Sequence, residues 1–150
     1  FGLDFVAIRN MNASGCSVNY WKTNIDKAIS GRTSGIQVSC SSLNNYTKQI
    51  GCMGMTTFDN ISMKDASARM GVNSSKTADV LCKNLITAEY NYCKGAYING
   101  DKNLTFLFLC WGEYVSSNPT RYSTTYSGWA KSWFDAYNNS NGGKVCGPSS

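Results

Sequence analysis

The chain carries seven cysteines at wide, irregular intervals along its 150 residues, with no C-x-x-C pair. This spacing argues against zinc ribbons and thioredoxin-like redox pairs. It is typical of a disulfide framework in a secreted protein, and the alternative is a cytosolic domain with reduced thiols. Three bonds would leave one thiol over, and the sequence leaves the pairing open. The disulfide candidates are Cys16, Cys40, Cys52, Cys82, Cys93, Cys110 and Cys146.

Histidine is absent from the sequence. Its absence excludes Ser-His-Asp and Cys-His catalysis and every zinc site with an imidazole ligand. The nine carboxylates show no suggestive spacing and are expected at the surface or at helix caps. No phosphate-binding glycine motif occurs. We therefore expect no catalytic residue, no cofactor site and no metal site.

Length and hydrophobic content indicate one secreted domain over residues 1–150, with 42% hydrophobic residues to form its core. The longest apolar run is Phe106–Trp111, far below the roughly 20 residues of a membrane span. The net charge of +5 comes from isolated basic residues, which argues against a specific nucleic-acid partner. The first residues resemble a processed mature form, because no basic signal-peptide start is present.

Six N-x-S/T sequons give weaker support for secretion and are candidate glycosylation sites. They lie at Asn12, Asn45, Asn60, Asn73, Asn103 and Asn138.

Hydrophobic periodicity predicts helices over residues 18–30, 78–89 and 128–139, with Ser17 capping the first and Gly31 ending it. Strands are expected over residues 3–9, 35–40, 52–58, 96–98 and 104–111, with a polar connection over 41–51 and irregular structure over 112–127.

This order predicts an α+β fold. An antiparallel sheet of about four to five strands would carry two helices on one face, in a split β-α-β arrangement, plus a C-terminal helix. Disulfides would hold the fold together. Because Cys82 lies on the apolar stripe of the second helix, its partner is expected on the sheet, with Cys110 or Cys40 favoured.

Trp129, Trp133 and Tyr137 repeat every four residues and share one helix face. Such a row can bind a partner. We favour packing on the core instead, because three exposed aromatics would form an aggregation-prone patch. Lys22 and Lys27 are further candidates for contacts with a partner.

Several segments resemble small secreted fungal effectors and killer toxins. The stretch 77–86, Tyr92-Cys93-Lys94-Gly95 and the run 104–110 follow the killer-toxin order of helix cysteine, second cysteine, glycine turn and central strand. Residues 21–27 are similar to the Trp-Arg-aromatic-x-x-basic motif of fungal avirulence effectors. In this chain Lys22 replaces the arginine, Thr23 replaces the aromatic residue, and the basic residue comes one place late. The resemblance implies a split β-α-β sandwich and a virulence function.

The first functional hypothesis is therefore a secreted, non-enzymatic effector or toxin-like protein. It would act outside the cell, for example in the host apoplast, by binding a host protein, a receptor or a cell-surface component of a host or competitor. Two alternatives remain open. One is a bacterial surface subunit, either pilin-like or an adhesin, and the other is a small secreted hydrolase that uses carboxylates alone.

Overall fold

The computed structural model describes residues 2–53, 57–118, 124–142 and 146–147. These residues form seven α-helices and one short 3-10 helix, and they contain no β-strand. The elements are α1 (Phe5–Arg9), α2 (Val18–Ser30), α3 (Cys40–Ile50), α4 (Met63–Met70), α5 (Thr77–Lys94), η1 (Ile98–Gly100), α6 (Lys102–Ser117) and α7 (Thr124–Asn138). The expected α+β fold is therefore wrong, and so is the resemblance to split β-α-β effectors.

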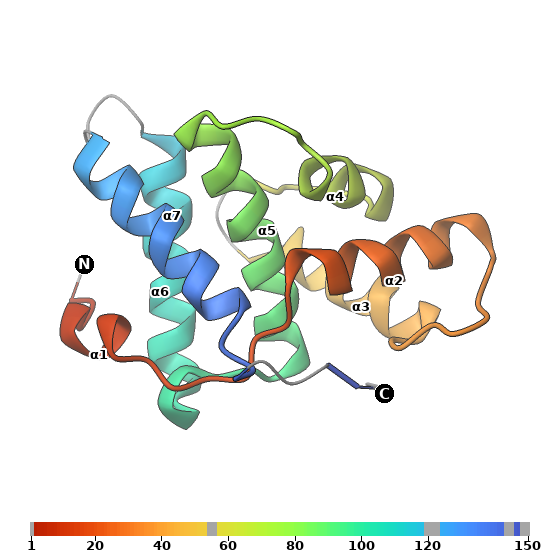
Figure 1. Ribbon diagram of the computed structural model, residues 1–150, viewed down its shortest axis with the longest axis horizontal. Helices are drawn as coiled ribbons and strands as arrows, with labels where there is room; N and C mark the ends of the chain where they lie inside the picture. The colour runs from red at the N-terminus through yellow and green to blue at the C-terminus, as the bar shows by residue number, and fades with distance from the viewer. Residues whose placement is uncertain (1, 54–56, 119–123, 143–145, 148–150) are drawn as a thin grey trace.

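Helix α5 lies at the centre of the molecule. Figure 1 shows α6 and α7 on one side of it and α2, α3 and α4 on the other, and α5 packs against all five. Its residues from Leu85 to Asn91 are all buried, so the helix is enclosed on every side rather than along one stripe. Gly95 ends the helix in the left-handed conformation, with a φ of 101°.

Helix α2 has the predicted bounds and the predicted caps. The Ser17 hydroxyl accepts a hydrogen bond from the Tyr20 amide, and Gly31 has a φ of 72°. Both caps satisfy backbone groups that a helix end leaves without partners.

Helix α6 takes the place of the predicted central strand over residues 104–111. The Asp101 side chain accepts a hydrogen bond from the Leu104 amide and so caps the helix, which continues to Ser117. A short apolar run is compatible with a buried strand or a buried helix, and periodicity alone does not separate them. Here the run is part of a helix of 16 residues.

The other predicted strands are also replaced. Residues 5–9 form α1, residues 35–39 lead into α3 without regular structure, and residues 96–98 lead into η1. The described residues of the predicted strand 52–58 form turns and a bend, and residues 54–56 lie outside the described part of the chain.

Helices α6 and α7 pack closely because Gly112 has no side chain. A Cβ atom at this position would lie 2.3 Å from the Phe134 ring. The rings of Phe108 and Phe134 stack with their centroids 4.0 Å apart. Both phenylalanines are fully buried, so this contact forms the core between the two helices.

One disulfide replaces the expected framework of three. Cys16, just before α2, is bonded to Cys146 in the C-terminal segment, 130 residues later. The other five cysteines are free thiols. The bond expected from Cys82 to Cys110 or Cys40 does not form, and the Cys82 sulfur instead accepts a hydrogen bond from the Arg69 guanidinium at 3.5 Å.

Candidate binding groove

A groove of about 520 Å³ runs along α2. Its other walls are the segment 35–37 and the C-terminal residues 138–147 that the structure describes. Its size is that of a small-ligand site. The lining residues are Gly15, Cys16, Ser17, Asn19, Tyr20, Thr23, Asn24, Lys27, Gly35, Gln37, Asn138, Asn139, Asn141, Cys146 and Gly147.

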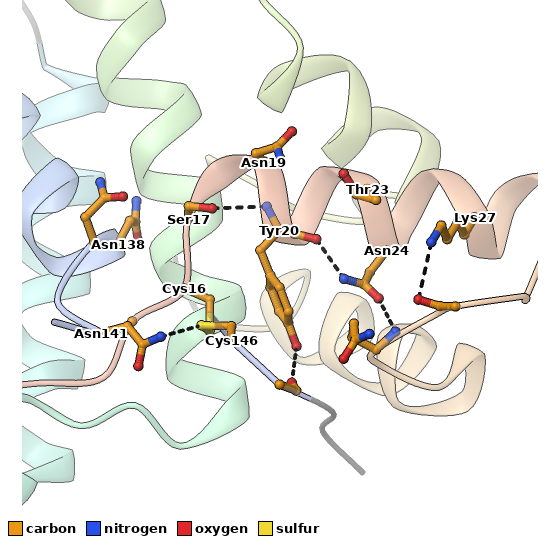
Figure 2. Close-up of a pocket in the computed structure, with 15 residues that line it drawn as sticks. Cys16, Ser17, Asn19, Tyr20, Thr23, Asn24, Lys27, Asn138, Asn141 and Cys146 are labelled. Carbon is orange, nitrogen blue, oxygen red and sulfur yellow. Dashed lines mark hydrogen bonds between the residues drawn. A yellow bond between two sulfur atoms is a disulfide. The ribbon is translucent and has the colours of Figure 1, made fainter. Parts of the chain in front are cut away.

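Two side chains of α2 reach from the helix to the opposite walls of the groove (Figure 2). The Tyr20 hydroxyl donates a hydrogen bond to the Gly147 carbonyl at 3.0 Å. The Lys27 ammonium donates to the Gly35 carbonyl at 3.3 Å. These contacts hold both ends of the groove against one helix.

Asn24 fixes the wall formed by residues 35–37. Its side-chain oxygen accepts hydrogen bonds from the backbone amides of Gln37 and Val38, at 2.6 and 3.1 Å. Its side-chain nitrogen donates to the Tyr20 carbonyl at 2.8 Å. Asn24 is buried and both polar atoms of its amide are hydrogen-bonded, so it positions the wall.

The disulfide forms the other wall. Cys146 is bonded to Cys16, and the Asn141 side chain donates to the Cys146 sulfur at 3.3 Å. The chain before Cys16 lies directly against α7, because a Cβ atom at Gly15 would be 2.0 Å from the Tyr137 carbonyl oxygen. Only glycine fits at this contact.

A buried amide network lies behind the groove, with Asn91 of α5 at its centre. The Asn91 oxygen accepts from the Cys16 amide at 2.7 Å and from the Trp21 indole at 3.0 Å. Its nitrogen donates to the Cys16 carbonyl at 2.8 Å and to the Asn138 side chain at 3.0 Å. Asn138 in turn donates to the Asn84 carbonyl. The network ties α2, α5 and α7 together behind the groove.

The described lining is polar but nearly uncharged. It contains one cation, Lys27, and no carboxylate. Within the described part of the chain, the side chains of Asn19, Thr23 and Gln37 make no hydrogen bond. Burial raises the pKa of Tyr20, and Tyr46 raises it further, so the phenol stays protonated as a donor at neutral pH. The groove therefore offers neutral donors and acceptors beside a half-buried aromatic ring.

The described lining also lacks a paired nucleophile and base. The chain has no histidine, the lining has no carboxylate, and the two lining cysteines are bonded to each other. Nucleophilic catalysis needs such a pair or an equivalent activating group.

The aromatic row predicted on the last helix does not line the groove. Tyr137 is fully buried and donates a hydrogen bond to the Ala96 carbonyl at 2.5 Å. Trp133 is half-buried, whereas Trp129 is 44% exposed. The Trp129 and Trp133 rings stack with centroids 5.5 Å apart, and Phe5 of α1 packs against both.

The two candidate lysines lie in different places. Lys27 lines the groove, as described above. Lys22 forms an ion pair with Asp26 at 2.8 Å and donates to the Ser67 hydroxyl at 3.3 Å, which links α2 to α4. Because both partners of the ion pair are partly exposed, it adds little to stability.

Five of the six sequon asparagines are exposed: Asn12, Asn45, Asn60, Asn73 and Asn103. The sixth, Asn138, is fully buried within the amide network. An N-glycan on Asn138 is not compatible with this fold.

Sequence reasoning missed the groove, and it also missed the buried asparagines that support its walls. Asparagine is a poor helix former, because its side chain competes with the backbone for hydrogen bonds. Yet Asn24, Asn84 and Asn91 lie inside helices and are buried. Buried asparagines within helices indicate side chains with a structural role.

Comparison with known proteins finds no match among family models, curated proteins or solved structures. None of the helices in the described residues is long and apolar enough to span a membrane.

Proposed function

We propose that the protein is a secreted, non-enzymatic binding domain that holds an uncharged polyhydroxylated ligand, a carbohydrate, in the groove along α2. One observation carries the proposal: the groove is lined by amide and hydroxyl side chains, with no carboxylate among its described residues.

The lining matches the chemistry of a sugar. Each amide offers donors and an acceptor, and each hydroxyl offers both, as sugar hydroxyls do. The half-buried ring of Tyr20 adds an apolar surface beside these groups. An apolar ligand would leave the free groups of Asn19, Thr23 and Gln37 without partners, which is costly once water is excluded.

A strongly charged ligand fits less well. Charged groups need opposite charges or several strong hydrogen bonds when they leave water. The described lining supplies one cation, Lys27, which already bonds to the Gly35 carbonyl. The neutral groups outnumber it, so they favour a neutral ligand.

The Cys16–Cys146 disulfide and the exposed sequons support an extracellular location. Carbohydrates are displayed on cell surfaces, which agrees with a cell-surface component of a host or competitor as the partner. The surface-subunit alternative would use the same groove as an adhesin. The hydrolase alternative has less support, because the described groove lining contains no carboxylate.

Binding to an array of neutral oligosaccharides, followed by calorimetry on the saccharides retained, tests the proposal. Gln37→Ala removes a free amide from the groove, and Gln49→Ala, at an exposed position on α3, is the matched control. We expect the first variant to bind about 5- to 100-fold more weakly, because a buried partner loses its hydrogen bond. The control should bind as the unchanged protein does.

Two results would contradict the proposal. One is the absence of binding to any neutral saccharide. The other is a saccharide affinity that Gln37→Ala leaves unchanged.

A further inference from the structure

The chain contains only two glutamates, Glu89 and Glu113, and the fold brings both into the interior. Glu89 lies in the central helix α5 and is fully buried. Glu113 lies in the neighbouring helix α6 and is 2% exposed. The sequence predicted carboxylates at the surface or at helix caps, and these two residues correct that expectation.

The surroundings of Glu89 do not favour a carboxylate anion. Neither side-chain oxygen of Glu89 has a well-formed hydrogen bond among the described residues. Burial raises the pKa of Glu89 well above its usual range, and the facing Glu113 carboxyl raises it further. A buried anion without a partner is costly, so these surroundings favour the protonated acid.

The pKa of Glu113 is also raised. Burial raises the pKa of Glu113 to about 7. Asp59, in the segment before α4, adds a like charge that raises this pKa further. This carboxyl therefore ionises in the neutral range rather than in the acidic range of an ordinary glutamate.

The titratable groups around the pair come from several elements, and they do not supply a balancing cation in the described residues. Cys82, Tyr90 and Cys93 of α5, Cys110 of α6 and Asp59 are neutral or acidic groups near the pair. The Arg69 side chain of α4 lies over the Phe58 ring and donates to the Cys82 sulfur. Among the described residues the ion pair is Lys22–Asp26 on α2, and it includes neither glutamate.

From this arrangement we infer that Glu89 and Glu113 form a pH-sensitive lock: α5 packs stably against α6 while the two buried carboxyls are protonated, and this interface loosens as the pH rises. The folded protein retains protons on both groups at pH values where the unfolded chain, with ordinary carboxyls, has lost them. Stability is then fully present below about pH 4.5 and falls as the pH rises toward 7. Glu89, whose pKa is raised well above its usual range, adds to the fall as it ionises.

This inference does not depend on the proposed ligand. The lock would make the protein most stable in a mildly acidic medium. Its failure would leave the groove along α2 unaffected, since neither glutamate lines it.

Urea unfolding of the whole chain at pH 4.5, 5.5, 6.5 and 7.5 tests the lock. We expect the unfolding constant to rise across this range by up to about tenfold per pH unit for each group. Glu113→Gln keeps the shape of the protonated acid and should make the profile less steep. Asp135→Asn, at an exposed position on α7, is the control and should leave the slope unchanged.

A second measurement keeps the test valid if a glutamine variant does not fold. Carbon-13 labelling of the glutamate carboxyls gives only two resonances in this chain. We expect one to titrate near pH 7 and the other to remain protonated there. Titration of both near pH 4.5, or a stability that is flat or increases from pH 4.5 to 7.5, would overturn the inference.

Discussion

Asn91 is the residue on which the back of the groove most depends. It is fully buried and makes four hydrogen bonds, to both backbone groups of Cys16, to Trp21 and to Asn138. Asn91→Ala would leave these partners buried without hydrogen bonds, at about 1–3 kcal/mol for each group that water cannot reach. We expect a loss of about 3 kcal/mol or more in the free energy of unfolding, measured by urea denaturation.

Asn44→Ala, at an exposed position on α3, is the matched control and should change the urea midpoint little. Equal midpoints for the two variants would show that the amide network does not hold the groove.

Two glycines in helices should respond to alanine with opposite signs. At Gly112 a Cβ atom would overlap the Phe134 ring at 2.3 Å, so Gly112→Ala should destabilise the protein by about 1–3 kcal/mol. At Gly128 nothing lies within 4 Å, so Gly128→Ala should stabilise α7 by about 0.5–1 kcal/mol. Thermal melting of both variants checks the pair, and a neutral Gly112→Ala would contradict the close packing of α6 and α7.

At the scale of the element, α7 has two different faces. Phe134 is fully buried against Phe108, whereas Trp129 is 44% exposed. We therefore expect Phe134→Ala to cost about 3–5 kcal/mol of unfolding free energy, as a large core truncation does. Trp129→Ala should cost less than Phe134→Ala, because it removes a partly exposed ring that contacts Trp133 and Phe5. Chemical denaturation of both variants tests this prediction. A larger loss of stability for Trp129→Ala than for Phe134→Ala would contradict the assignment of the buried face of α7.

Helices with a clear apolar stripe were predictable from sequence. The bounds of α2 were correct, because Ser17 and Gly31 mark its ends. The sequence correctly predicted that α5 is helical. Its burial on all sides was not predicted, because a stripe pattern does not show how many neighbours a helix has. The helical state of 128–138 was also correct.

Helices α3, α4 and α6 were missed for different reasons. In α3, Leu43, Tyr46 and Ile50 follow helical spacing, but the polar residues between them were interpreted as a connection. In α4, the capping box of Ser62 and Asp65 was not recognised. In α6 the apolar run was assigned to a strand, since a run of this length is ambiguous.

The groove could not be predicted from the sequence, because it is a product of tertiary structure. Residues 35–37 are held at the groove by the side chains of Asn24 and Lys27, and Cys146 reaches it through a bond across 130 residues. No local sequence pattern indicates either contact. The pairing of Cys16 with Cys146, among seven cysteines, becomes apparent only in the folded chain.

At the scale of the whole molecule, the disulfide closes nearly the full chain into one loop. Such a bond restricts the unfolded state, and its loss costs about 2–5 kcal/mol in small secreted domains. We expect Cys16→Ser combined with Cys146→Ser to lower stability by this amount and to weaken saccharide binding, because the C-terminal wall of the groove is released. Calorimetric melting measures the first effect and titration the second.

Cys52→Ser changes an exposed free thiol and is the control. It should alter neither property. A reductant without effect on the melting temperature would contradict the role of the disulfide.

The groove along α2 is the proposed binding site for a neutral carbohydrate. The most direct test is an NMR titration of the ¹⁵N-labelled protein with a saccharide retained from the array. We predict the largest shift changes at residues 15–27, 35–37, 138–142 and 146–147, with the side-chain amide of Gln37 among them. Shift changes confined to Phe5 and Trp129, or no shift changes at saturating saccharide, would contradict carbohydrate binding in this groove.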